Sequence, residues 1–468
     1  MADDSANPST ESRPATDTIA AISTPPGRGG IGIVRLSGPM ATSIAAQLVR
    51  LRQPLEHGRA RLADVLDSTE SGRDSERIDE AVVTFFAAPN SYTSDDLVEI
   101  AAHGSPVVLD LLLRRSLELG ARLADPGEFT QRAFLAGRID LTQAEAVRDL
   151  IEAQTLTQAR QAASQMGGAL SRRVAPVKQN LVELIALLEA GIDFAEDDVD
   201  VTPGVEIVRR IGHVTAPLEA LEASFSRGRI VHDGLTLAIV GRPNAGKSSL
   251  FNRLVERDRA IVTATPGTTR DTVSERISLD GIPLELVDTA GLREAHDVAE
   301  QLGIARSREA LADAELVLIV LDATQPPNEE ERALFEAVQG RPALIAVNKS
   351  DLAASPIEGP PACDGVPVVG TSALTGEGVA ELRGRLVEMA SGGAASESGM
   401  LTSVRHHQAV STALSAMGDA ARANSDGIPH EMILLDLYRA LWALDALTGQ
   451  TTADDILQLI FSAFCIGK

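Results

Sequence analysis

The segment 241–248 constrains this chain of 468 residues more than any other stretch. It reads Gly-Arg-Pro-Asn-Ala-Gly-Lys-Ser and fits the pattern G-x-x-x-x-G-K-[ST]. The apolar run Leu235–Val240 before it predicts a buried strand, and an amphipathic helix is predicted to begin at Ser248. A strand, a glycine-rich loop and a helix N-terminus in that order aim backbone N–H groups and a helix dipole at phosphates. The segment therefore predicts a nucleoside triphosphate site, in which Lys247 reaches the β- and γ-phosphates and Ser248 binds Mg²⁺.

Motifs further along the chain predict that the base is guanine. The apolar run 343–347 predicts a buried strand, and it ends in Asn348-Lys349-Ser350-Asp351, the pattern N-K-x-D. A buried Asp351 carboxylate can accept hydrogen bonds from N1–H and the exocyclic amine of guanine, whereas adenine has no such pair of donors and would leave the acceptor unpaired. A strand predicted at 366–369 leads to Thr371-Ser372-Ala373, a loop expected to contact guanine O6 through backbone N–H groups.

A D-x-x-G motif completes the phosphate site, but the glutamine that often follows this motif is missing. The strand predicted at 282–287 ends in Asp288-Thr289-Ala290-Gly291, the D-x-x-G pattern, which places Asp288 on Mg²⁺ through water and the Gly291 N–H toward the γ-phosphate. Many regulatory GTPases carry Gln directly after this glycine to orient the attacking water. Leu292 stands there and cannot hydrogen-bond to water, so another residue or a partner must activate it. The candidates in the following segment are Glu294, His296 and Glu300.

The segment 261–271, Ile-Val-Thr-Ala-Thr-Pro-Gly-Thr-Thr-Arg-Asp, is predicted to be the first switch. Thr269 within it is the natural second protein ligand of Mg²⁺. The carbonyl groups of this threonine-rich stretch and the side-chain carbonyl of Asn244 could hold a monovalent cation beside the bridge between the β- and γ-phosphates. Such a cation would neutralise the charge that an arginine otherwise covers.

Composition narrows the class of protein. A chain of this length with 44% hydrophobic residues predicts about three domains with sizeable cores. Its two cysteines, Cys363 and Cys465, lie far apart, which argues against a disulfide framework or a cysteine metal site and suits the cytoplasm. No apolar run approaches the roughly 20 residues of a membrane span. The net charge of −24 argues against holding nucleic acid by bulk electrostatics, so RNA would need a local basic patch or a partner subunit.

Hydrophobic periodicity divides the remaining sequence. Residues 17 to about 130 mix predicted strands with a helix at 106–120 and indicate an α+β domain. From about 141 to 228 the period is helical, opening at a predicted capping box, Thr142-Gln-Ala-Glu145. Further helices are predicted at 403–423, 432–446 and 453–464. Since these need a surface on which to bury their apolar stripes, we expect them to pack on the earlier helices, with the GTPase domain inserted between.

The predicted boundaries follow from these composition changes. The first 16 residues are polar and acidic and lack the basic and apolar regions of a signal peptide, so a disordered leader is expected. The predicted segments are a leader 1–16, an N-terminal domain 17–132, a first helical part 133–230, a GTPase domain 231–390, a flexible linker 391–400 and a second helical part 401–468.

From about Asp17 to Lys468 the chain resembles one family, the tRNA-modification GTPases MnmE, also called TrmE. Beyond the GTPase motifs, the resemblance is carried by Asp17-Thr-Ile, Thr24-Pro-Pro-Gly-Arg-Gly-Gly30, Arg35-Leu-Ser-Gly38, Ser91-Tyr-Thr with Glu99, His103-Gly104, Pro126-Gly-Glu-Phe-Thr-Gln-Arg-Ala-Phe-Leu135, Asp140-Leu-Thr-Gln-Ala-Glu-Ala146 and the tail Phe461-Ser-Ala-Phe-Cys-Ile-Gly-Lys468.

The resemblance implies a multidomain α+β and α/β protein. Its N-terminal domain would bind a tetrahydrofolate derivative (5-formyl- or 5,10-methylene-tetrahydrofolate), as one-carbon aminomethyltransferases do, and would form a homodimer. The helical domain would be completed by the C-terminal helices and would carry an inserted Ras-like P-loop GTPase domain. A partner subunit that carries FAD, usually called MnmG or GidA, would join it in a heterotetramer and hold most of the tRNA. Together they would add an aminomethyl or carboxymethylaminomethyl group at C5 of the wobble uridine, with the amine taken from glycine or ammonium.

The resemblance also assigns roles to single residues of this sequence. It places Arg35, Glu99, Arg138 and Lys468 on the folate, and gives Cys465 either a role in the modification chemistry or that of a small buried thiol. It places K⁺ on Asn244, Thr263, Thr265 and Thr268, and Mg²⁺ on Ser248 and Thr269. It makes Glu300 the residue that positions water, with GTPase domains meeting across the dimer. The full predicted GTP-binding set is Asn244, Ala245, Gly246, Lys247, Ser248, Ser249, Thr263, Thr268, Thr269, Asp288, Gly291, Asn348, Lys349, Asp351, Ser372 and Ala373.

Two other classes of function fit part of the chain. A ribosome-assembly or signalling GTPase without modification chemistry explains 241–372 equally well, but leaves 17–140 and the C-terminal tail unexplained. A free-standing one-carbon transferase regulated by GTP explains the N-terminal domain, but predicts turnover without a flavoprotein.

Overall fold

The computed structural model describes residues 17–67, 76–193, 203–255, 275–287, 314–352, 365–391, 399–450, 464, 465 and 467. The chain forms two compact units. One comprises 1–148 with 448–468, and the other comprises 149–447. The predicted leader 1–16, most of the linker 391–400 and most of the helix predicted at 453–464 lie outside the described residues.

The first unit is built on a seven-stranded sheet with the strand order β3-β4-β5-β6-β2-β1-β7. Its strands are antiparallel except for the short pairing of β1 with β7. Two helices, α1 (Ala41–Leu48) and α2 (Pro106–Glu118), bury their apolar residues in one core with alternate residues of the strands. The strands are β1 (Ile19–Ile22), β2 (Gly29–Ser37), β3 (Val49–Leu51), β4 (Ala60–Leu66), β5 (Arg77–Phe86), β6 (Leu97–Gly104) and β7 (Arg122–Leu123).

Two further helices follow this sheet, α3 (Glu128–Leu135) and α4 (Leu141–Glu152). The capping box at the start of α4 differs from the predicted one. The backbone N–H of Gln143 donates to the Asp140 carboxylate at 2.9 Å, and the Asp140 N–H donates to the Gln143 side chain at 3.0 Å. The prediction of Thr142 and Glu145 was wrong because the helix begins at Leu141, which makes Asp140 the cap and leaves Thr142 inside the first turn.

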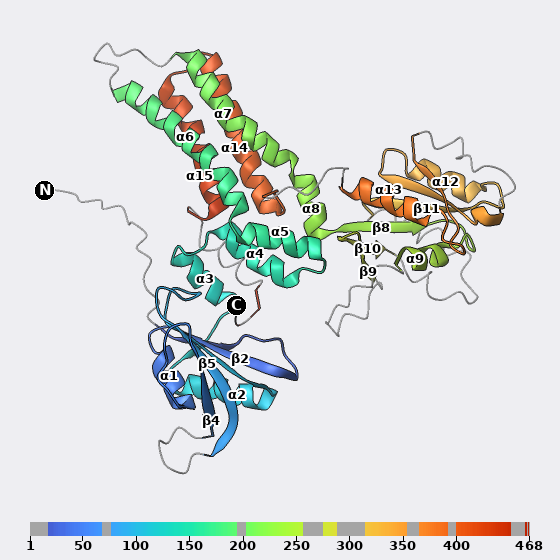
Figure 1. Cartoon of the computed structure of the whole chain (residues 1–468). Coiled ribbons are helices and arrows are strands. Elements are labelled where there is room, and N and C mark those ends of the chain that lie inside the picture. The colour runs from blue at the N-terminus through green and yellow to red at the C-terminus, as the bar shows by residue number, and fades with distance from the viewer. Residues whose placement is uncertain are drawn as a thin grey trace. The chain divides into compact units, whose positions relative to one another are not determined.

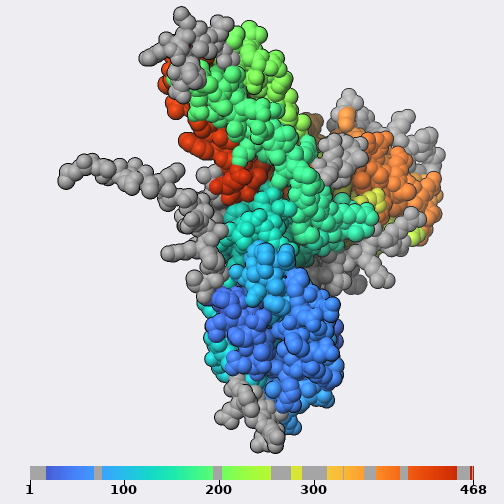
Figure 2. Space-filling model, turned by 60° about the vertical axis from the view of Figure 1, so that its left-hand side comes forward, coloured from blue at the N-terminus to red at the C-terminus, as the bar shows by residue number. Residues whose placement is uncertain are grey.

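The helices of the second unit share one apolar core across a long gap in sequence. Four long helices contribute Leu, Ile, Val, Ala and Met side chains that are almost fully buried. In Figures 1 and 2 the red C-terminal helices lie alongside the green helices that precede the GTPase domain. This confirms that the GTPase domain is inserted in a helical domain. The helices are α5 (Leu156–Met166), α6 (Ala169–Asp193), α7 (Gly204–Ala223), α8 (Phe225–Asp233), α14 (Val404–Ser425) and α15 (His430–Thr448).

The inserted domain has a six-stranded sheet in the order β13-β12-β11-β8-β10-β9, parallel except for the edge strand β9. The observed β8 and β10 have the bounds that the sequence predicts, and β11 is a fully buried strand for which no prediction was made. The elements are β8 (Leu235–Val240), α9 (Lys247–Val255), β9 (Glu275–Leu279), β10 (Ile282–Val287), β11 (Leu316–Asp322), α12 (Glu329–Ala337), β12 (Ala343–Asn348), the 3₁₀ turn η2 (Ser350–Leu352), β13 (Val368–Gly370) and α13 (Val379–Ser391).

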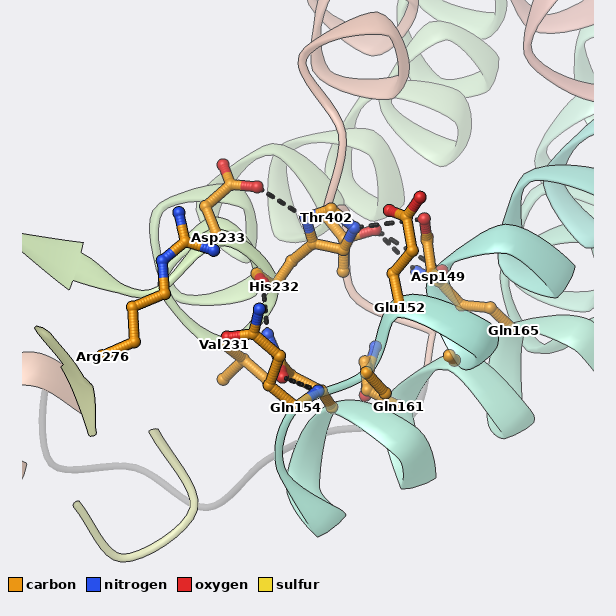
Figure 3. A pocket seen from close by; sticks show the side chains of 13 residues that line it. Asp149, Glu152, Gln154, Gln161, Gln165, Val231, His232, Asp233, Arg276 and Thr402 are labelled. Carbon is orange, nitrogen blue, oxygen red and sulfur yellow. Dashed lines mark hydrogen bonds and ion pairs between the residues drawn. The ribbon is translucent and has the colours of Figure 1, made fainter. Parts of the chain in front are cut away.

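The chain enters the inserted domain through α8, which is tied to the neighbouring helices by specific contacts. His232 lies between two carboxylates, with Nδ1 2.6 Å from Asp233 and Nε2 3.3 Å from Asp149 at the end of α4. The Gln158 side chain donates to the His232 carbonyl at 2.6 Å. These residues border a cavity of about 370 Å³, into which Arg276 of β9 also extends (Figure 3). We call His232, Asp149, Asp233 and Gln158 the α8 joint.

After the inserted domain, the chain returns at Leu401 and packs with its backbone close to α8. A Cβ atom on Gly228 would lie 1.9 Å from the carbonyl oxygen of Leu401, so this position of α8 accepts only glycine without movement. The Leu401 N–H donates to the Ser224 hydroxyl at 3.2 Å, and Gln165 of α5 donates to the Met400 carbonyl at 3.0 Å. The segment that enters the inserted domain and the segment that leaves it are therefore both hydrogen-bonded to α5.

Candidate functional site

The phosphate loop lies between β8 and α9, as the motif predicts. Lys247 is the first residue of α9, and its Nζ donates to the carbonyl oxygens of Gly241 and Arg242 at 2.8 and 2.9 Å. Asn244 is exposed and has a positive φ of 64°. The N-terminus of α9 therefore presents backbone N–H groups beside a lysine, which is an arrangement that binds phosphates.

The base-reading loops are tied directly to the phosphate loop. The buried side chain of Asn348, at the end of β12, donates to the Ala245 carbonyl at 2.9 Å and accepts from the Ala373 N–H at 3.0 Å. Gly246 has φ of 90°, and a Cβ atom there would lie 2.2 Å from the Asn348 amide nitrogen. Asn348 thus joins three predicted parts of one nucleotide site: 241–248, 348–351 and 371–373.

Asp351 differs from its prediction in one respect. Its carboxylate is exposed in η2, whereas the argument for guanine selection assumed a buried group. The polypeptide alone does not bury it, so its discrimination against adenine depends on a base that covers it when bound. Ser372 is fully buried, Ala373 is half-buried and Ser249 on α9 is exposed.

Several predicted site residues lie outside the part of the chain that the structure describes. They are Thr263, Thr265, Thr268, Thr269, Asp288, Gly291, Glu300 and Lys468.

In the first unit, the C-terminal tail docks beside two predicted folate residues. Arg35 of β2 donates to Oε1 of Glu99 on β6 through Nε at 3.0 Å and Nη2 at 2.7 Å. The Arg35 Nη1 group also donates to the Gly467 carbonyl at 3.3 Å, and that carbonyl accepts from the Ser23 hydroxyl at 3.0 Å. Cys465 is exposed, which excludes the second of its two predicted roles, that of a small buried thiol.

Two arginine side chains of this region lie over aromatic rings. The Arg35 guanidinium lies 5.5 Å from the centroid of the Phe129 ring, and that of Arg138 lies 5.7 Å from the centroid of Tyr92. The Tyr92 hydroxyl is 3.0 Å from that of Thr130 on α3. Three predicted folate residues thus lie on neighbouring elements of one unit: Arg35, Glu99 and Arg138.

Sequence reasoning missed a buried carboxylate, Asp322, between the phosphate loop and the base-reading loop. Asp322, at the end of β11, accepts a hydrogen bond from Lys349 Nζ at 2.7 Å. Burial alone would raise the pKa of Asp322, but the hydrogen bonds from Lys349 and Thr324 lower it to about 2. The signal that could have found it is the apolar run 316–321, which ends in this aspartate.

Comparison with known proteins agrees with this geometry. The family model for the MnmE helical domain matches residues 141–465, and the model for the N-terminus of the GTP-binding protein TrmE matches residues 18–138. The chain belongs to the MnmE family of tRNA modification GTPases. One family member, the tRNA modification GTPase MnmE of Koribacter versatilis, is 59% identical over 97% of this chain and 99% of its own length. The MnmE of Moorella thermoacetica is 41% identical over 97% of this chain and 99% of its own length.

Among solved structures, the G domain of FeoB from T. maritima is 29% identical, covering 33% of this chain and 98% of that one, with a TM-score of 0.25. Membership of the MnmE family makes the chain a GTP hydrolase that takes part in tRNA modification. It also decides against a switch without modification chemistry. Within the described residues, no helix is long and apolar enough to cross a membrane.

Proposed function

We propose that the chain is a potassium-activated GTPase which, with a partner subunit that carries FAD, adds an aminomethyl or carboxymethylaminomethyl group at C5 of the wobble uridine in the cytoplasm. The one-carbon unit would come from a tetrahydrofolate derivative. The observation that carries the proposal is the docking of the C-terminal tail on Arg35, beside Glu99, in a chain that also holds a phosphate loop. One chain thus combines a candidate folate site with a nucleotide site.

In the GTPase domain, we assign Mg²⁺ to Ser248 and Thr269, with Asp288 acting through water, and water positioning to Glu300. We assign K⁺ to Asn244, Thr263, Thr265 and Thr268. The exposed side chain and positive φ of Asn244 support this, because they leave its carbonyl accessible at the rim of the phosphate loop. When bound, K⁺ would supply the positive charge that the β/γ bridge requires during hydrolysis.

The cation assignment is tested by GTP hydrolysis in K⁺ and Na⁺ at equal ionic strength. We expect strong stimulation by K⁺ that Asn244→Ala abolishes. Asn252→Ala is the matched control, because Asn252 is an exposed asparagine on the neighbouring helix α9. Equal rates of the wild type in both salts would refute the potassium site.

For the folate, we assign binding to Arg35, Glu99, Arg138 and Lys468. Arg35 donates twice to the same oxygen of Glu99, Oε1, so Oε2 stands outside this pair as an acceptor for the amino and ring N–H groups of a pterin. The cations would hold the carboxylates of the glutamate tail. Exposed Cys465 is available for the modification chemistry.

The folate assignment is tested by calorimetric titration of the full chain with 5-formyl-tetrahydrofolate. Glu99→Gln should weaken binding about tenfold or more, because a charged acceptor of two donors is lost. Glu80→Gln is the control, since Glu80 is an exposed glutamate of the same sheet that is paired with Arg52. Unchanged affinity of Glu99→Gln would refute the folate site.

We further propose that the first unit forms the homodimer. Apolar side chains of β4 and β5 stand 42–43% exposed at Leu62, Ile78 and Val82, and Leu62 faces Val82 across the strand pair. Exposed apolar groups gathered on one surface favour a contact with another chain. Leu62→Asp with Val82→Asp should produce a monomer in analytical ultracentrifugation, and an unchanged dimer would refute this surface.

The acidic net charge of −24 supports the assignment of most tRNA contacts to the partner subunit, in a heterotetramer. Pulldown of the tagged chain should recover a flavoprotein. Mass spectrometry of tRNA from cells lacking the chain should show an unmodified wobble uridine. The boundaries 17–132, 133–230, 231–390 and 401–468 remain part of the proposal, and limited proteolysis should cut first within 391–400.

A further inference from the structure

The buried Asp322 carboxylate and two nearby cations connect the two halves of the nucleotide site. Asp322 is 5% exposed at the end of β11, between β8 and β12 in the sheet. Its Oδ2 accepts from Lys349 Nζ at 2.7 Å and lies 3.9 Å from Nη2 of Arg242. Arg242 belongs to the phosphate loop and Lys349 to the base-reading loop. One carboxylate oxygen therefore faces a cation from each loop.

Lys349 is also held in an unfavourable backbone conformation. Its φ is 65°, in the left-handed region that non-glycine residues rarely adopt. Such a conformation persists only where surrounding contacts enforce it, and it occurs preferentially at functional sites. The short ion pair with Asp322 is one of these contacts. Lys349 lies two residues before Asp351, so its conformation also sets where the guanine-reading carboxylate points.

On the phosphate side the charges are paired but incompletely hydrogen-bonded. Arg242 Nε lies 3.5 Å from Oε1 of Glu331, the residue that completes the capping box of α12. Among the described residues, neither Arg242 Nη2 nor Glu331 Oε1 has a hydrogen-bond partner within the usual distance. Nη2 of Arg242 is therefore held near Asp322 by charge rather than by a directional hydrogen bond.

We propose that Asp322 is a positioning residue for the guanine nucleotide, which fixes the base-reading loop to the phosphate loop through Lys349 and Arg242. The inference deepens the nucleotide site proposed above and rests on it. Asp322 itself touches neither base nor phosphate in this assignment. It acts by holding Lys349 in its strained conformation, so that Asp351 meets the edge of the base while the phosphates occupy the loop.

The test compares the binding of GDP with that of IDP, whose base lacks the exocyclic amine that Asp351 would accept from. The wild type should prefer GDP about tenfold or more, because one donor to a charged acceptor is lost in IDP. Asp322→Asn should weaken GDP binding about 10- to 100-fold and bring the GDP/IDP ratio to within about threefold of one. A loss of folding alone would lower both affinities equally and leave the ratio unchanged.

Two further variants separate positioning from general destabilisation. Lys349→Met removes the group through which Asp322 positions Asp351, so adding Asp322→Asn to it should leave the GDP/IDP ratio unchanged, while the lost pairing with Arg242 affects both affinities alike. This double variant also replaces both partners of the Lys349–Asp322 pair and leaves Arg242 paired with Glu331, which keeps the test available if Asp322→Asn alone does not fold. Asp280→Asn is the control: its carboxylate pairs with Arg383 at 2.8 Å on the surface of the same domain, and it should behave as the wild type.

The outcomes separate the role of Asp322 from the existence of the nucleotide site. Wild-type affinity for GDP in Asp322→Asn, equal losses for GDP and IDP, or a further change of the GDP/IDP ratio in the double variant would overturn the role of Asp322. Failure of the wild type to bind GDP at all would instead refute the proposed nucleotide site.

Discussion

His232 provides the most quantitative test of how α8 is held in place. The carboxylates beside its ring, Asp149 first and then Asp233, raise the pKa of His232 from 6.5 to about 10. At about 1.36 kcal/mol for each tenfold change in proton affinity, this rise corresponds to at most about 5 kcal/mol. The Asp233 side chain is 51% exposed and contributes little, whereas that of Asp149 is 10% exposed. We therefore expect His232→Gln to destabilise the second unit by about 2 kcal/mol, between the values for exposed and buried pairs.

The pH dependence of this loss has a definite sign. Because the pKa of His232 is raised in the folded chain, its stabilisation is fully present below pH 6.5 and is lost as the pH rises through about 10. Calorimetric unfolding should therefore show His232→Gln melting a few degrees below the wild type at about pH 6, with the gap largely closed at about pH 10.5. Both proteins lose their other interactions equally at high pH, so the difference between their melting temperatures reports on His232 alone.

The control is His213→Gln, because His213 is an exposed histidine on α7. It should melt with the wild type at both pH values. A difference between His232→Gln and the wild type that is the same at about pH 6 and about pH 10.5 would refute the charged α8 joint. A His213→Gln variant that loses as much stability would do the same.

Three shorter predictions test other parts of the chain. Gly228→Ala should cost about 3 kcal/mol in urea unfolding, because its Cβ would lie 1.9 Å from the Leu401 carbonyl, whereas Gly212→Ala on the open face of α7 should cost nothing. Asn348→Ala should weaken GDP binding about 10- to 100-fold in a fluorescent-nucleotide titration, because it leaves a carbonyl and an N–H group unpaired. Burial raises the pKa of Glu128, but the hydrogen bonds from Arg122 and other donors outweigh this and lower the pKa overall. Glu128→Gln should therefore destabilise the first unit by about 2 kcal/mol near pH 7, and the difference should vanish as the pH falls below 4.5.

Much of the fold was predictable because its signals are local. The apolar run before the phosphate loop gave the bounds of β8, since a short apolar segment followed by a glycine-rich loop has few alternatives. The insertion was predictable because α14 and α15 have apolar stripes that require a partner surface. The capping box of α4 was misplaced because two overlapping polar patterns start within three residues, and only the first helical residue decides between them.

The α8 joint was not predictable for a different reason. His232 and Asp149 lie on helices that are far apart in sequence, and no periodicity relates them. In the sequence, Asp149 of α4, Gln158 of α5 and His232 of α8 look like ordinary polar residues of separate helices until the helices are placed together. Only the packing shows that a glutamine, a histidine and two aspartates meet around one cavity (Figure 3).

The position of Asp322 was partly predictable, because one additional prediction, that of the strand it ends, would have located it. The carboxyl ends of neighbouring parallel strands lie at the same edge of a sheet, and ligands of open α/β sheets bind there. Arg242 follows β8, Asp322 ends β11 and Lys349 follows β12, and the observed order places β11 between the other two. Recognition of 316–322 as a buried strand would have brought a carboxylate between the two cations of the phosphate and base loops. The missing information was thus the order of the strands in the sheet. The charged residues themselves can be read from the sequence at or just after the end of each apolar run.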